Sequence, residues 1–252
     1  VCGKKPDTAN FQDELTGALI SLATAAKDKE HLKSTDVILL GGLFTTITNV
    51  NFNDSSIKER IEQVNNEKKL YGSESENFDM HQIWNADEDI RSLKSLILFG
   101  LKGVAAYAYH AHVLSYDDSE INNYFYKALD ALGRNLSAQE LLAIVMETGK
   151  INFKCMQLLD LANTKTYGTP KPVNVPLTVE KGPFIVITGH DLYDLKLLLE
   201  QTKDKGINIY THGEMLPAHG YPELKAYKHL KGNFGTAWQN QQKEFDNIPA
   251  PV

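Results

Sequence analysis

Two short apolar runs are each followed by side chains that bind metals or transfer protons. The run 184–188 (FIVIT) precedes His190, and the run 207–211 (INIYT) precedes His212 and Glu214. Imidazole and carboxylate groups are ligands for iron and zinc, and they also serve as general acids and bases. The pattern indicates a metal site or acid–base chemistry. A histidine after a strand can equally be an ordinary turn residue or a helix cap.

The elements expected around these residues would bring two of them to one place. Leucines between residues 192 and 199 predict a helix, for which Asp191 is a plausible N-cap, and Gly206 would end it. Strand, helix and strand in this order predict a right-handed βαβ unit. Ligands of open α/β sheets bind at the carboxyl ends of the strands, so His190 and Glu214 are expected at the same edge of the sheet.

Further side chains give weaker signals. His219 lies in the same predicted loop as His212 and Glu214, which modestly favours a functional loop. Cys155 lies among apolar residues of a predicted helix and is expected to pack as a small hydrophobe. Cys2 has no second cysteine three residues away, so alone it indicates nothing.

Composition excludes some classes of protein. The 252 residues carry 26 Lys and Arg against 32 Asp and Glu, a net charge of −6, and no basic stripe indicates a nucleic-acid binder. Lys94 and Lys102 interrupt the apolar stretch 93–114, which predicts a buried helix rather than a membrane span. No basic start precedes a short apolar block, so we expect a cytoplasmic protein without a signal peptide. The first residue is not Met and the last residues are extended, so we expect a fragment cut at both ends.

Helical patterns fill the first two thirds of the chain. Ser137 and Glu140 form a capping box at the start of one predicted helix. The segment 43–52 is rich in β-branched residues and could form a strand by propensity, and the polar stretch 65–89 is expected to include a loop. Helices are expected at 11–27, from 54 through 64, at 93–114, at 121–132 and, after the capping box, at 137–161.

The character of the sequence changes near Gly168, where prolines become frequent. We therefore predict a multi-domain α and α/β protein. Residues 1–168 would form a helical-bundle domain and residues 169–181 a linker. Residues 182–252 would form the first part of a truncated, Rossmann-like α/β domain with a parallel sheet.

Several blocks of the sequence resemble the hybrid-cluster protein family, also called prismane proteins or hydroxylamine reductases. The resemblance covers essentially the whole chain, and its most specific block is THGEMLPAHGYPEL at 211–224. The further blocks, in the same order as in the family, are FTTITNVNF at 44–52, GLKG at 100–103, ITGHDL at 187–192, and GNFG at 232–235 leading to WQNQ at 238–241.

The resemblance implies two iron–sulfur centres in the full-length protein. One is a 4Fe-4S cluster (2Fe-2S in some members) bound by four cysteines near the amino terminus, of which Cys2 matches the last. The other is a hybrid 4Fe-2O-2S cluster, for which His190 matches the histidine ligand and Glu214 the first glutamate ligand. The remaining ligands would lie outside residues 1–252, so the chain alone is expected to be inactive. The stretch 65–89 also looks shorter than in typical members.

The implied activity is the reduction of hydroxylamine to ammonia and water, and of nitric oxide, with electrons from a separate reductase. His212 and His219 are candidates for proton delivery or for hydrogen bonds to the cluster ligands. Two alternatives remain open: a mononuclear metal-dependent hydrolase using His190 and Glu214, and a non-catalytic α/β binding module. We expect no nucleic-acid or membrane partner.

Overall fold

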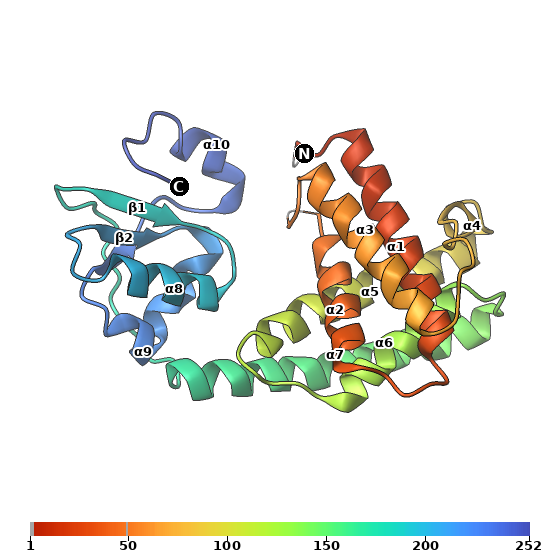
Figure 1. Cartoon of the computed structure of the whole chain (residues 1–252). Coiled ribbons are helices and arrows are strands. Elements are labelled where there is room, and N and C mark those ends of the chain that lie inside the picture. Colours follow the sequence, from red (N-terminus) through yellow and green to blue (C-terminus); the bar gives the residue numbers. More distant parts are fainter. Residues whose placement is uncertain (1–2, 49) are drawn as a thin grey trace. The chain divides into compact units, whose positions relative to one another are not determined.

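Helices make up the amino-terminal part of the chain, as the sequence predicts (Figure 1). The computed structural model describes residues 3–48 and 50–252. The chain divides into two compact units, Val1–Leu159 and Asp160–Val252, with the division inside α7. The helices of the first part are α1 (Pro6–Ala26), α2 (Lys33–Thr45), α3 (Asp54–Leu70), α4 (His81–Trp84), α5 (Glu88–His112), α6 (Ser119–Leu132) and α7 (Ala138–Tyr167).

The first unit is built around α1, which packs against α2, α3 and α6. Leu15, Leu19 and Leu22 lie one turn apart on α1 and are completely buried. Each such side chain stabilises the fold by about 1.5–3 kcal/mol relative to an exposed one. Close helix contact needs small residues: a β-carbon on Gly42 of α2 would lie 2.8 Å from Leu19 Cδ2.

The capping box and the buried cysteine are both confirmed. Ser137 N–H donates to Glu140 Oε2 (2.8 Å), and Glu140 N–H donates to Ser137 Oγ (3.3 Å), so α7 begins at the next residue, Ala138. The thiol of Cys155 is buried against the Val104 carbonyl of α5, at 3.6 Å. Burial raises the pKa of Cys155 to about 12, so it stays a protonated, apolar packing group.

None of the helices in the described residues has the length and apolar content that a membrane crossing needs.

The strand predicted at 43–52 is wrong for the residues the structure describes. Residues up to Thr45 continue α2, and a turn and an extended segment follow. Thr45 Oγ1 donates to the Gly41 carbonyl (2.8 Å) and Thr46 Oγ1 to the Leu43 carbonyl (2.7 Å). These local hydrogen bonds, together with the buried Leu43, override the strand propensity of the threonines.

The polar stretch 65–89 contains a loop, as predicted, after the end of α3. Helix α3 starts after the N-cap Asn53 and continues to Leu70. Lys68, nearly buried, then organises the loop: its ammonium donates to the Ser75 carbonyl at 2.6 Å and to Asn77 Oδ1 at 2.8 Å. The Lys68 side chain therefore connects the last turn of α3 to the loop that follows it.

The second unit contains a parallel sheet, and the predicted fold class is confirmed. Strands β1 (Phe184–Ile187), β2 (Asn208–Thr211) and β3 (Leu230–Asn233) are neighbours in this order, and both pairings are parallel. Helix α8 (Leu192–Thr202) connects β1 to β2. Strand β3 was not predicted. The short elements that follow β2 and β3 are η1 (Gly213–Gly220), α9 (Pro222–Lys225), η2 (Trp238–Asn240) and α10 (Gln241–Glu244).

The segment predicted as a linker, residues 169–181, is hydrogen-bonded along the second unit. Asn233 N–H donates to the Pro176 carbonyl (2.9 Å), and Glu180 N–H donates to the Tyr210 hydroxyl (2.8 Å). A β-carbon on Gly232 would lie 2.2 Å from the Pro176 oxygen. The segment thus covers β3, and only glycine fits beneath it.

We predict that Gly17→Ala destabilises the first unit by about 1–3 kcal/mol, because the packed site has no room for a methyl group. The new β-carbon would lie 2.1 Å from the Phe78 carbonyl oxygen, and Phe78 N–H is itself held by Ser21 Oγ at 2.8 Å. Urea unfolding followed by circular dichroism measures the change. The matched control is Gly149→Ala, an exposed helical position with nothing within 4 Å, where we expect no loss of stability. Equal effects of the two substitutions would contradict this packing.

Candidate functional site

The pairing of β1 with β2 brings the two predicted ligand loops to one edge of the sheet, which we call the carboxyl rim. Ile187 pairs with Thr211, and the ladder continues with His212 N–H donating to the Ile187 carbonyl at 2.9 Å. His190 lies three residues beyond Ile187, and Glu214 lies three residues beyond Thr211. Both side chains are exposed. The two loops therefore leave the sheet side by side, as the βαβ order predicts.

The loop after β1 is short because α8 starts directly behind His190. Asp191 is the N-cap, and its carboxylate accepts hydrogen bonds from the backbone N–H groups of Tyr193 (2.8 Å) and Asp194 (3.4 Å). Gly189 has a φ of 111°, a conformation that side chains with a β-carbon rarely adopt. The turn and the cap together fix where His190 leaves the sheet.

The loop after β2 begins with an extended residue and then turns into η1. His212 is extended, Gly213 has a φ of 56°, and Glu214 lies in the first turn of η1. Met215 N–H donates to the His212 carbonyl at 3.2 Å. Glu214 thus follows closely after the end of β2. The residue before it, Gly213, has a positive φ that favours glycine.

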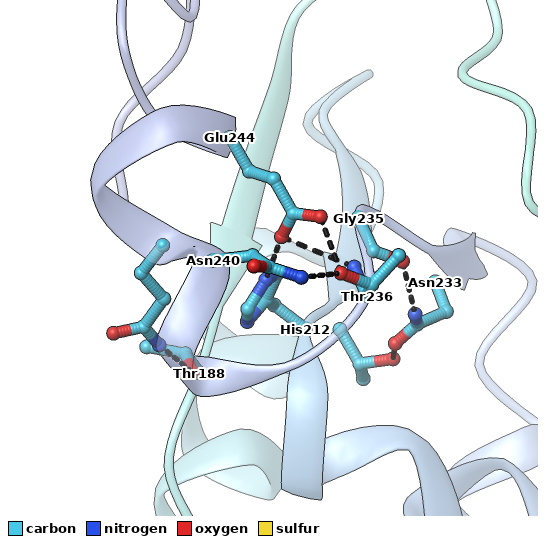
Figure 2. Close-up of polar contacts among 9 residues, drawn as sticks. Thr188, His212, Asn233, Gly235, Thr236, Asn240 and Glu244 are labelled. Atoms are coloured by element: carbon cyan, nitrogen blue, oxygen red, sulfur yellow. Dashed lines mark hydrogen bonds and ion pairs between the residues drawn. The ribbon is translucent and has the colours of Figure 1, made fainter.

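His212 does not join the exposed pair, because its ring is completely buried. Its Nε2 lies 2.8 Å from Glu244 Oε2 (Figure 2). The ring of Phe245 packs edge-on against it, with 4.8 Å between the ring centroids. Nδ1 has no hydrogen-bond partner within the part of the chain that the structure describes. Within the described residues the ring is hydrogen-bonded through Nε2 alone, to a residue that follows β3.

Glu244 is an ionised acceptor for three donors. Thr236 donates to it through its hydroxyl and through its backbone N–H (3.1 Å), and His212 is the third partner. These hydrogen bonds, first that from the Thr236 hydroxyl, then that from His212 and then that from the Thr236 N–H, lower the pKa of Glu244 to about 2. Asn240 Nδ2 donates in turn to Thr236 Oγ1 at 2.8 Å, which fixes the hydroxyl (Figure 2).

His219 is also completely buried, under the sheet end rather than at the exposed rim. Its Nε2 lies 3.0 Å from Thr211 Oγ1, and that hydroxyl donates to Asn233 Oδ1 at 2.9 Å. The hydroxyl therefore accepts the Nε2–H proton of His219. Burial, helped by the nearby Lys225, lowers the pKa of His219 to about 4, so the ring is neutral at neutral pH.

Sequence reasoning missed the residues that follow β3. Gln241 Nε2 donates to Thr188 Oγ1 at 2.9 Å, and Glu244 holds His212, so α10 contacts the loops of both strands. The blocks at 232–235 and 238–241 resemble family motifs. This resemblance indicated that the region matters, but it gave no role to Gln241 or Glu244. The contacts themselves join residues up to 53 positions apart, and no local pattern reveals them.

One of the two cysteines lies within the described residues. Cys2 lies outside the described residues, and Cys155 is buried in the helical unit. Within residues 3–48 and 50–252 no group of three or more His, Cys, Asp and Glu side chains is arranged to hold a metal ion. At the carboxyl rim, the predicted ligands on the described residues are one imidazole, His190, and one carboxylate, Glu214.

Comparison with known proteins gives matches over the whole chain. The hydroxylamine reductase of Thermodesulfovibrio yellowstonii is 45% identical over 285 aligned residues, which cover 100% of this chain and 53% of the relative. The corresponding values for the hydroxylamine reductase of Methanocella arvoryzae are 43%, 287 residues, 100% and 53%. That of Desulfovibrio desulfuricans is 42% identical over 280 residues, covering 100% of this chain and 51% of the relative.

The matched relatives are longer than this chain. The chain spans about half the length of the curated relatives it matches. Because 285 aligned positions exceed the 252 residues, the first relative carries at least 33 additional residues inside the matched region (285 − 252). The profile of the Prismane/CO dehydrogenase family matches residues 1–252. The chain belongs to the Prismane/CO dehydrogenase family.

Proposed function

We propose that these residues belong to an iron–sulfur oxidoreductase that reduces hydroxylamine, in which His190 and Glu214 bind the hybrid cluster. The relatives are named hydroxylamine reductases. The reaction takes up two electrons and two protons per hydroxylamine, breaks its N–O bond, and yields ammonia and water. Nitric oxide is a second candidate substrate. A reductase in the cytoplasm would supply the electrons.

The single observation that supports this proposal is the register of β1 and β2. It places an exposed imidazole and an exposed carboxylate three residues beyond the same pair, Ile187 and Thr211. A β-carbon on Gly189 would meet nothing within 4 Å, so the surface beside His190 is open. Nitrogen and oxygen donors suit iron that must also bind an oxygen- or nitrogen-bearing substrate. When bound, the cluster supplies electrons and open iron positions.

The residues of this chain would hold the group rather than complete it. His190 contributes a nitrogen donor and Glu214 a movable carboxylate, and the other ligands would come from the half of the protein that the relatives have in addition. Cys2 is proposed as one of four cysteine ligands of the amino-terminal 4Fe-4S or 2Fe-2S cluster.

The two buried histidines have different roles in this proposal. His212 and His219 lie close to Glu214 in sequence, but both rings are buried and bonded to protein groups. A neutral imidazole with a pKa of about 4 is a poor proton donor near neutral pH. We therefore assign His219 to holding the end of β2 through Thr211, and His212 to holding the loop that carries Glu214.

Iron and acid-labile sulfide analysis of the protein from the complete reading frame tests the proposed ligands. We expect His190→Ala and Glu214→Ala each to lose the hybrid cluster and keep the amino-terminal one, so that iron per chain falls by roughly half. Hydroxylamine turnover should fall about a hundredfold or more, since even outer-shell changes at metal sites cost up to that much.

Two exposed residues provide matched controls for this experiment. His81 is exposed and pairs with Asp79 in the helical unit, and Glu223 is exposed in α9. His81→Ala and Glu223→Gln should retain iron, sulfide and activity. Full iron and sulfide in His190→Ala or Glu214→Ala would refute the assignment. A single zinc without sulfide in the unchanged protein would instead indicate the hydrolase.

The buried state of His219 predicts a pH-dependent stability. Its pKa in the folded chain, about 4, lies below the ordinary 6.5, so the unfolded chain binds the extra proton between these values. The neutral His219 ring contributes to the free energy of unfolding, and this contribution is fully present above pH 6.5. It decreases by about 3 kcal/mol as the pH falls to about 4. His219→Gln keeps a donor for Thr211 but cannot titrate. Urea unfolding at pH 7 and pH 5 should show a smaller pH effect for this variant than for the unchanged chain; equal pH effects would contradict the buried neutral ring.

A further inference from the structure

The segment after β3 reaches across the carboxyl rim and contacts both ligand loops. We call residues 234–245 the rim segment. It starts as a continuation of the sheet, with Phe234 N–H donating to the Thr211 carbonyl at 2.7 Å, and it then turns through η2 into α10. Figure 2 shows the side chain of Glu244, in this segment, turned toward the ring of His212.

The two contacts are equivalent in position. Gln241 binds Thr188, two residues before His190, and Glu244 binds His212, two residues before Glu214. Gln241 and Glu244 are three residues apart on α10, so they lie on one face of the helix. A single helical turn therefore connects the two loops at matching points.

We propose that Gln241 and Glu244 are positioning residues that set the spacing of the two ligand loops, and this rests on the proposed function. Glu244 fixes the His212 ring and with it the backbone that leads to Glu214. Gln241 fixes the Thr188 hydroxyl and the start of the loop that carries His190. Two ligands from different loops can bind one iron group only if the loops are held at a constant separation.

The packing around Glu244 shows how closely it is held. Its side chain is 18% exposed and accepts from Thr236 and His212. A β-carbon on Gly235 (φ 66°) would lie 2.6 Å from Glu244 Oε2 and 2.9 Å from His212 Cδ2. Glycine at 235 thus leaves just enough room for the carboxylate–imidazole contact.

Hydrogen exchange and cluster content, measured on the protein from the complete reading frame, test the proposal together. We expect Gln241→Ala to speed amide exchange about tenfold at 188–190, and Glu244→Ala to do so at 212–215, since each loses a tying hydrogen bond. Exchange in β1 and β2 should not change. Both variants should bind less hybrid cluster, seen as lower iron and sulfide and a weaker electron paramagnetic resonance signal of that cluster.

Conservative and neighbouring variants separate positioning from general stability. Glu244→Gln retains one acceptor oxygen and should restore part of the cluster content that Glu244→Ala loses. Gln242→Ala and Glu223→Gln, at exposed positions, should match the unchanged protein. If the loops loosen while cluster content and signal stay normal, or if neither loop loosens, the positioning role is overturned. If His190→Ala and Glu214→Ala keep the cluster, the proposed function fails first, and the positioning role with it.

Discussion

The register between β1 and β2 is the constraint on which the site depends. Side chains alternate across a strand, so a shift of one residue would turn the buried Val186 outward and move every group beyond the strand end. The observed register is extended past the strands by the hydrogen bond from His212 N–H to the Ile187 carbonyl. His190 and Glu214 follow the ends of neighbouring strands because this pairing holds, although α8 separates them in sequence.

Buried polar groups explain much of the remaining structure around the rim. An imidazole without water must find partners within the protein. His219 is hydrogen-bonded to the Thr211 hydroxyl, which in turn donates to Asn233. His212 is hydrogen-bonded to Glu244. The hydrogen bond between Thr211 and Asn233 joins the ends of β2 and β3. We regard this polar layer as the support that keeps the two exposed side chains in place.

The sequence predicted those parts of the fold that local patterns determine. Short apolar runs with a leucine-rich helix between them gave the βαβ unit, and a capping box gave the start of α7. Strand β3 was not predicted because its residues, LKGN, show no apolar alternation. Its Gly232 is covered by the Pro176 backbone, a contact across 56 positions (232 − 176) that no local pattern reveals. The wrong strand at 43–52 shows the reverse error, since threonine hydroxyls and a buried leucine kept α2 helical.

The candidate site was predictable to a similar extent. Strand ends place His190 and Glu214, so topology suffices for them. The role of Glu244 depends on α10 returning to the rim 32 residues after His212, and only the three-dimensional structure shows that return. The same holds for the burial of His212 and His219, because sequence proximity to Glu214 suggests function but not exposure.

Anomalous diffraction at the iron absorption edge, on crystals of the protein from the complete reading frame, tests the central claim most directly. The register predicts one iron group bonded to both the His190 imidazole and the Glu214 carboxylate, above the ends of β1 and β2. Iron bound elsewhere, or bound at the rim by only one of these two side chains, would contradict it.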